Sequence, residues 1–111
     1  MRDRKPSAAE AHLEHAGIRL DPNDRRAYTA AAAVDLSSRE YTLLEFFMRN
    51  PGQMLTRDQI LARVWTNEID PDSNIVSVYV QYLRRKLGEA TIETVRGVGY
   101  RLTAHRQTIR D

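Results

Sequence analysis

The sequence contains no cysteine among its 111 residues. Disulfides, thiolate metal sites and cysteine nucleophiles are therefore excluded, and the composition fits a reducing, cytoplasmic environment. No apolar run approaches the roughly 20 residues that cross a bilayer. The charged start of the chain is not followed by an apolar stretch, so we expect neither a membrane span nor a secretory signal. Hydrophobic residues make up 41% and charged residues 29%, which predicts one soluble domain with a core of its own.

The motifs of common enzyme classes are also missing. The chain has no glycine-rich phosphate loop followed by lysine, no nucleophile elbow and no HExxH pair. His12 and His15 would share a face only on a helix and have no third ligand nearby. The acidic residues between positions 66 and 73 lack the glycine and terminal glutamate of a calcium loop. We therefore expect no catalysis, no metal and no cofactor.

Charge is small in total but unevenly distributed. The formal net charge is +2. Residues 74–111 carry seven basic residues against three acidic ones, whereas residues 1–73 carry ten against twelve. A basic C-terminal part suggests a polyanionic partner for that part of the chain.

The first third of the chain predicts a small antiparallel sheet. Residues 1–16 have no sustained apolar period and are interpreted as a linker or disordered arm. Strands are expected over 18–20, 26–29 and 33–36, with the sequence Asp-Pro-Asn-Asp at 21–24 as a turn.

Three helices and a hairpin are expected next. Ser37 with Glu40, and Thr56 with Gln59, have capping-box spacing and predict the starts of two helices. The first ends at the Asn-Pro-Gly of 50–52, and the second buries residues up to Trp65. A third runs from about residue 74 to 87 and ends before a glycine. Strands over 91–95 and 100–103 then flank an Arg-Gly-Val-Gly turn, and residues 105–111 form a basic tail.

The third helix has two unlike faces. Its apolar stripe consists of Val76, Val80, Leu83 and Leu87. The opposite face and its flanks contain no acidic residue and consist of Asn74, Ser77, Val78, Gln81, Tyr82, Arg84 and Arg85. A face without acidic side chains is not repelled by the phosphates of DNA. The open alternative is a surface helix that is basic by chance. A basic residue at the tip of the hairpin, Arg96, favours DNA, since guanidinium groups enter minor grooves.

The motifs, in their order and spacing, resemble the C-terminal effector domain of OmpR/PhoB-type bacterial response regulators. The resemblance covers about residues 17–103, and its strongest parts are LSSREYTLL at 36–44, NPGQMLTR at 50–57, Val-Trp at 64–65, YLRRKL at 82–87 and TVRGVGYRL at 94–102. It implies an α+β fold, a winged helix-turn-helix over residues 17–104 with an N-terminal antiparallel sheet, three helices and a C-terminal β-hairpin wing. It also implies sequence-specific binding of promoter DNA and control of transcription within a two-component system.

Candidate contacts follow from the helix faces and the resemblance together. Base edges are expected to meet Ser77, Val78, Gln81 and Tyr82, because glutamine pairs with adenine and valine touches the thymine methyl. Contacts with the DNA backbone or minor groove are expected from Trp65, Asn74, Tyr79, Arg84, Arg85, Thr94, Arg96 and Tyr100. For the three aromatic residues, core packing is an open alternative. The resemblance implies that the loop after the second helix touches RNA polymerase, through Glu68, Asp70 and Asp72.

The chain departs from the family pattern in places that matter for its partners. Ser77 and Tyr79 stand where an acid and often a histidine are common, so base preference should be its own. Ala30-Ala31-Ala32 replaces a glycine-containing hairpin. The phosphoacceptor receiver domain is absent, which indicates either a fragment or a regulator without one. We expect a weakly binding monomer that binds tandem half-sites. The alternative is a winged-helix module that binds RNA polymerase or a partner domain.

Overall fold

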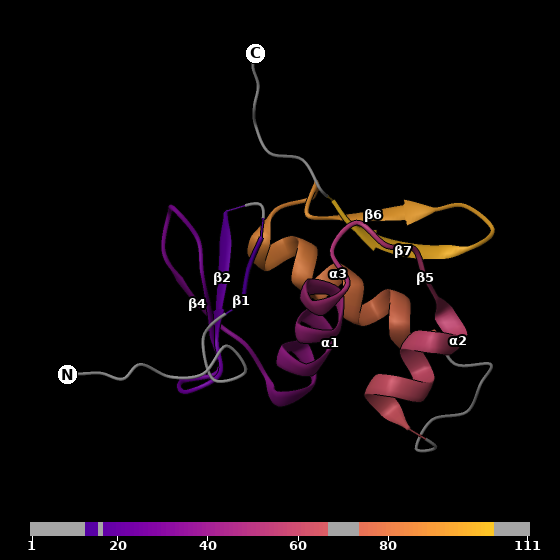
Figure 1. Cartoon of the computed structure of the whole chain (residues 1–111), viewed down its shortest axis with the longest axis horizontal. Helices are drawn as coiled ribbons and strands as arrows, with labels where there is room; N and C mark the ends of the chain where they lie inside the picture. Colours follow the sequence, from indigo (N-terminus) through magenta and orange to yellow (C-terminus); the bar gives the residue numbers. More distant parts are fainter. Residues whose placement is uncertain (1–12, 16, 67–73, 104–111) are drawn as a thin grey trace, which may run out of the picture.

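A computed structural model describes residues 13–15, 17–66 and 74–103 of the chain. Along the chain, four strands are followed by the helices and then by a hairpin, and one short strand stands between the first two helices. Figure 1 shows the N-terminal sheet on one side of the helices and the C-terminal hairpin above them. The N-terminal sheet has the order β1-β2-β3-β4, with strands Leu13–His15, Ile18–Asp21, Arg26–Tyr28 and Ala33–Asp35. The C-terminal sheet has the order β5-β7-β6, with strands Leu55–Thr56, Gly99–Leu102 and Ile92–Val95.

The N-terminal sheet begins earlier than the sequence indicated. Residues 13–15 fall in the segment interpreted as a linker, but they form β1 and pair with β2, Leu13 opposite Leu20 and His15 opposite Ile18. Leu13 packs against the core, and the ring Nε2 of His15 lies 3.2 Å from the carbonyl oxygen of Thr103. Three residues are too few to show an apolar period, which is why the pattern missed this strand.

The alanine-rich turn between β3 and β4 is closed by a threonine. Thr29 N donates to Ala32 O over 3.0 Å, and the Thr29 hydroxyl accepts from the amides of Ala31 and Ala32. The side-chain oxygen thus satisfies turn amides in a turn that contains no glycine. Beyond this turn the two strands pair antiparallel, with Ala27 opposite Val34.

Both capping boxes form as predicted. Helix α1, Ser38–Arg49, begins where Glu40 N donates to Ser37 Oγ over 3.1 Å and Ser37 N donates to Glu40 Oε1 over 2.8 Å. Helix α2, Arg57–Ile60, has the same arrangement between Thr56 and Gln59. Each box satisfies amides that the first helical turn leaves without a partner.

The second helix is not uniform, although the sequence predicted one regular helix. After α2 it widens into a π-helical segment, η1, over Leu61–Trp65. Val64 and Trp65 are buried within it, as expected. Near its end the carbonyl oxygen of Val64 accepts a 2.5 Å hydrogen bond from Arg39 Nη1 of α1. The arginine replaces the backbone N–H donor that carbonyl groups at the end of a helix lack.

Helix α3, Ile75–Leu87, packs by the predicted stripe. Val76, Val80 and Leu83 are at most 1% exposed, and Leu87 is half-buried at the edge of the core. Phe47 of α1 is fully buried in the same cluster. None of the helices in the described ranges is both long and apolar enough to span a membrane.

Strand β5 and the close packing at Gly99 were not predicted. Thr56 pairs with Gly99, and Leu55 with Tyr100. A Cβ atom on Gly99 would lie 2.8 Å from the Thr56 Cα, 2.9 Å from the Leu55 carbonyl carbon and closer still to the Leu55 oxygen. Gly99 therefore permits the close approach of two strand backbones, in addition to standing at the end of the predicted Arg-Gly-Val-Gly turn.

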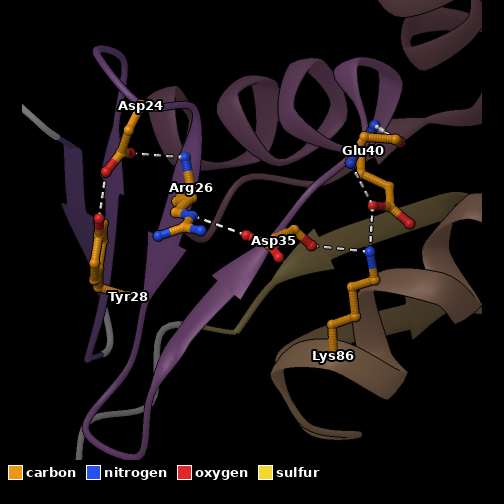
Figure 2. Close-up of polar contacts among 7 residues, drawn as sticks. Asp24, Arg26, Tyr28, Asp35, Glu40 and Lys86 are labelled. Carbon is orange, nitrogen blue, oxygen red and sulfur yellow. Dashed lines mark hydrogen bonds and ion pairs between the residues drawn. The ribbon is translucent and has the colours of Figure 1, made fainter.

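Polar groups run across one end of the N-terminal sheet (Figure 2). The Tyr28 hydroxyl donates to Asp24, and this hydrogen bond raises the pKa of Tyr28. The Arg26 Nε donates to Asp35 Oδ1 over 2.8 Å, and the negative charge of Asp35 raises the pKa of Arg26. Arg26 and Asp35 stand directly opposite each other in β3 and β4, so this pair joins the two strands. Both contacts are exposed and add little to stability.

A lysine of α3 joins that sheet to α1 (Figure 2). Lys86 Nζ donates to the carbonyl oxygen of Asp35 over 2.9 Å and to Glu40 Oε1 over 2.6 Å. Glu40 is 5% exposed, and among the described residues it is the one charged side chain that is buried. The same carboxylate oxygen therefore caps α1 and binds α3.

Candidate nucleic-acid interface

The outer face of α3 and the β6–β7 hairpin lie side by side. Figure 1 shows the hairpin running beside α3, with its tip extending toward the end at which the helix begins. Contact between the two elements is direct, since Arg84 of α3 donates to the backbone and side chain of β6. We call the outer face of α3 together with the loop 96–98 the helix–hairpin surface.

The residues predicted to read bases lie together on one side of α3. Ser77 and Gln81 are exposed, Tyr82 is 39% exposed and Val78 is half-buried. Ser77 Oγ donates to Asn74 O over 3.2 Å, which leaves its lone pairs available to an external donor. The described helix presents amide, hydroxyl, methyl and aromatic groups here without an acidic side chain.

An aromatic ladder connects this face with the core. The rings of Trp65 and Tyr79 meet edge to face at 5.3 Å, and those of Tyr79 and Tyr82 at 5.1 Å. Trp65 is 3% exposed and Tyr79 is half-buried. Packing therefore accounts for Trp65, whereas Tyr79 supports the exposed ring of Tyr82 from the inner side.

The residues predicted to contact the DNA backbone differ in the hydrogen bonds that they make within the described part of the chain. Asn74 is exposed at the N-cap of α3, and its side chain makes no capping hydrogen bond. Arg85 is also exposed, and the described part of the chain offers its guanidinium no hydrogen bond or ion pair. By contrast, Arg84 Nη2 donates to Thr94 Oγ1 over 2.8 Å. Tyr100 is half-buried against the core.

The hairpin tip is a three-residue loop that exposes an arginine. Val98 N donates to Val95 O over 2.9 Å, and Gly97 between them has a φ of 76°. That left-handed conformation suits glycine. Arg96 is exposed, and so is Val98, with 43% of its surface accessible. Val98 was not predicted as a site residue, although an apolar side chain within a glycine-flanked turn was a visible signal.

Local charge on the hairpin comes mainly from Arg96. The other arginine of the described hairpin, Arg101, is paired with Glu93 at 3.0 Å. The acidic residues Glu68, Asp70 and Asp72 lie outside the described residues, so their predicted place in a polymerase-contacting loop stays a prediction. Within the described ranges no three His, Asp or Glu side chains are grouped as a metal would need.

Comparison with known proteins agrees with this geometry. The family described as "Transcriptional regulatory protein, C terminal" matches residues 31–102. The chain is 44% identical over 103 residues to the transcriptional regulatory protein TcrA of Mycobacterium tuberculosis, covering 89% of this chain and 41% of that protein. It is 45% identical over 91 residues to CutR of Streptomyces coelicolor, covering 81% and 42%. The chain thus spans about four tenths of the length of the curated relatives it matches.

Solved structures lead to the same fold. The Klebsiella pneumoniae RstA DNA-binding domain, solved in complex with the RstA box, superposes with a TM-score of 0.75 at 28% identity, covering 85% of this chain and 98% of that one. The predicted winged-helix fold and the resemblance to OmpR/PhoB-type regulators are confirmed. The chain belongs to the family of transcriptional regulatory protein C-terminal domains, in which a sheet, three helices and a hairpin wing form the winged-helix unit of response regulators.

Proposed function

We propose that the chain binds double-stranded promoter DNA as the effector domain of a two-component response regulator. The observation that carries the proposal is the helix–hairpin surface, in which an acid-free helix face lies beside an arginine-tipped hairpin. A helix of this size fits the major groove, and a narrow basic tip fits the adjacent minor groove. The RstA domain, which shares this fold, was solved bound to DNA.

The base-reading role belongs to the exposed groups of α3. Gln81 can pair with adenine through its amide, and Tyr82 and Val78 can touch thymine methyl groups. Ser77 can donate to or accept from either kind of base. The ladder behind Tyr82 holds its ring in one place, which favours a defined contact over a variable one.

Contacts with the sugar–phosphate backbone are assigned to donors around that face. Asn74 and Arg85 are exposed, and Arg96 stands at the tip. The hydroxyl of half-buried Tyr79 can add a further donor, as can those of Thr94 and Tyr100 at the hairpin. Such contacts position the domain without reading sequence.

Affinity of the isolated domain is expected to be low, and two copies are expected on tandem half-sites, since one small module makes few contacts. Selection of sites from random duplex DNA with the purified chain tests the proposal. We expect a repeated motif to be enriched, and the logarithm of the binding constant to fall linearly with the logarithm of salt concentration. Failure to enrich any motif, or binding that hardly responds to salt, would favour a protein-interaction module for polymerase or a partner domain instead.

The proposal predicts a specific effect of Arg96→Ala. Loss of one phosphate-neutralising guanidinium should weaken binding to any duplex and reduce the salt slope by about one. Titrations at several salt concentrations measure this slope. Arg49→Ala is the matched control, because Arg49 is held by Glu45 on α1 at 3.1 Å, outside the helix–hairpin surface. An unchanged slope in Arg96→Ala removes Arg96 from the contacts.

Gln81→Ala should alter preference more than overall affinity. Because an amide pairs with one base, we expect a loss of discrimination of about 1–3 kcal/mol at a single position of the site. Parallel selection experiments with the two proteins measure it. Arg85→Ala serves as comparison, since loss of a phosphate contact should weaken binding evenly and return the original motif. The same motif from Gln81→Ala would mean that Gln81 does not read bases.

A further inference from the structure

Arg84 bridges the helix and the hairpin of the helix–hairpin surface. Its Nε donates to the carbonyl oxygen of Ile92 over 2.9 Å, and its Nη2 donates to the hydroxyl of Thr94 over 2.8 Å. Both acceptors belong to β6, two residues apart. One planar guanidinium therefore binds the backbone and a side chain of the same strand, a geometry that a lysine ammonium cannot reproduce.

The bridge lies on the side of the hairpin that no other strand covers. In the C-terminal sheet β7 is central and is held by β5 on one side and by β6 on the other. The outer edge of β6 has no strand partner in the described sheet. Since Arg84 donates to an Ile92 carbonyl there, it fastens β6 to α3 directly, in addition to the short connection at 88–91.

The neighbouring arginine provides a contrast. Arg84 is half-buried and uses two donors within the domain, whereas Arg85 is exposed and uses none among the residues that the structure describes. A guanidinium has five N–H groups in a fixed fork, so the orientation of Arg84 is set by its two internal bonds. Two adjacent residues of the same type are thus placed for different tasks.

We propose that Arg84 is a positioning residue. With the Thr94 hydroxyl, it holds the hairpin at a fixed orientation to α3, so that Arg96 enters the minor groove when α3 occupies the major groove. The entry of Arg96 into the minor groove rests on the proposed function, DNA binding. It replaces, for Arg84, the phosphate contact that the sequence predicted.

The first experiment needs no DNA. Residual dipolar couplings of backbone amides in the free protein report the orientation of the hairpin relative to α3. We expect one orientation in the unmodified chain and in Thr94→Ser, which keeps the hydroxyl. In Thr94→Val, which has the same shape without a hydroxyl acceptor, the hairpin couplings should be reduced by averaging. Equal couplings in all three proteins would overturn the positioning role, whatever the DNA result.

The second experiment measures which DNA groove loses its protein contacts when the Arg84–Thr94 bridge is removed. Dimethyl sulfate modifies guanine N7 in the major groove and adenine N3 in the minor groove, so one footprint on a selected duplex reports both. Thr94→Val and Arg84→Met should lose adenine protection at the hairpin while guanine protection under α3 persists. Thr94→Ser should keep both. Affinity should fall about tenfold in either variant, and the double variant should be no weaker than Arg84→Met alone, because both remove one bridge.

Other outcomes identify other roles. If Arg84→Met lowers the salt slope by about one and Thr94→Val does not, Arg84 is a phosphate contact and the proposal fails. Simultaneous loss of both protections with an unchanged thermal midpoint would also overturn it. Arg85→Met is the matched control. It should weaken binding, with guanine and adenine protection reduced together. If the unmodified chain protects neither groove, the proposed function fails, and the dipolar couplings still decide the role of Arg84.

Discussion

Replacing Gly99 with alanine is expected to destabilise the domain by about 2–4 kcal/mol, because the added methyl group overlaps backbone atoms that cannot turn aside. Those atoms belong to β5, where the Thr56 Cα lies 2.8 Å from the position of the new Cβ. Relief requires β5 to move away from β7, which breaks the pairing of Thr56 with Gly99. Urea unfolding followed by circular dichroism measures the loss.

Gly97 supplies the matched control for this prediction. It has a φ of 76° but open space around its Cβ position, so that Gly97→Ala carries only the left-handed backbone penalty of about 1–2 kcal/mol. Gly97→Asn should cost less, since asparagine tolerates that conformation. If Gly99→Ala proved no more destabilising than Gly97→Ala, the close approach of β5 would not hold in solution.

The two glycines show why the hairpin could be predicted only in part. Alternating residues on both sides of an Arg-Gly-Val-Gly segment predict two strands and a turn, and both strands were found. The role of Gly99 depends on Leu55 and Thr56, more than forty positions earlier in the chain. A two-residue strand such as β5 carries no period of its own, so its pairing cannot be read locally.

The helices were predictable because their signals are local. The capping residue and its partner stand three positions apart at Ser37 and at Thr56, and the buried stripe of α3 repeats within 13 residues. The π-helical segment after Ile60 was missed, since it conforms to the same apolar spacing as a regular helix. Its Val64 carbonyl is satisfied by Arg39, 25 positions away.

The exposure of the candidate site residues was predicted, but the hydrogen bonds that Arg84 makes within the domain were not. A helical period separates inner from outer residues, and it placed Gln81, Tyr82 and Arg85 on the exposed side correctly. The same period placed Arg84 beside Arg85 among the residues predicted to contact the DNA backbone. Only the packing of β6 beside α3 shows that the Arg84 guanidinium is bound within the domain. Side-chain hydrogen bonds between separate elements cannot be predicted from a local sequence pattern.

Removing the ammonium of Lys86 should have the second large effect. Lys86→Met keeps the apolar stem but leaves the carboxylate of Glu40, 5% exposed, with the Ser37 amide and without its ion-pair partner. Breaking a buried pair on one side leaves an uncompensated charge. Because Lys86 itself is 37% exposed and water can partly replace it, we expect a loss of about 2–4 kcal/mol in urea unfolding.

Lys86 matters beyond its pair, because its ammonium joins three elements. It binds the carbonyl oxygen of Asp35 at the end of β4 and the carboxylate of Glu40 in α1, while its own backbone belongs to α3 (Figure 2). Loss of this group should therefore loosen the N-terminal sheet from α1 and α3. Hydrogen exchange should show faster opening of β3 and β4 than of β6 and β7 in Lys86→Met.

A double variant separates charge from packing. Lys86→Met combined with Glu40→Gln removes both charges, and the amide oxygen of glutamine can still accept from Ser37 N, so the pair should cost less than the sum of the single changes. Arg85→Met, the exposed neighbour, should change stability by less than about 0.5 kcal/mol. Additive losses in the double variant would mean that Glu40 and Lys86 contribute independently, and the ion pair would then not be what couples α1 to α3.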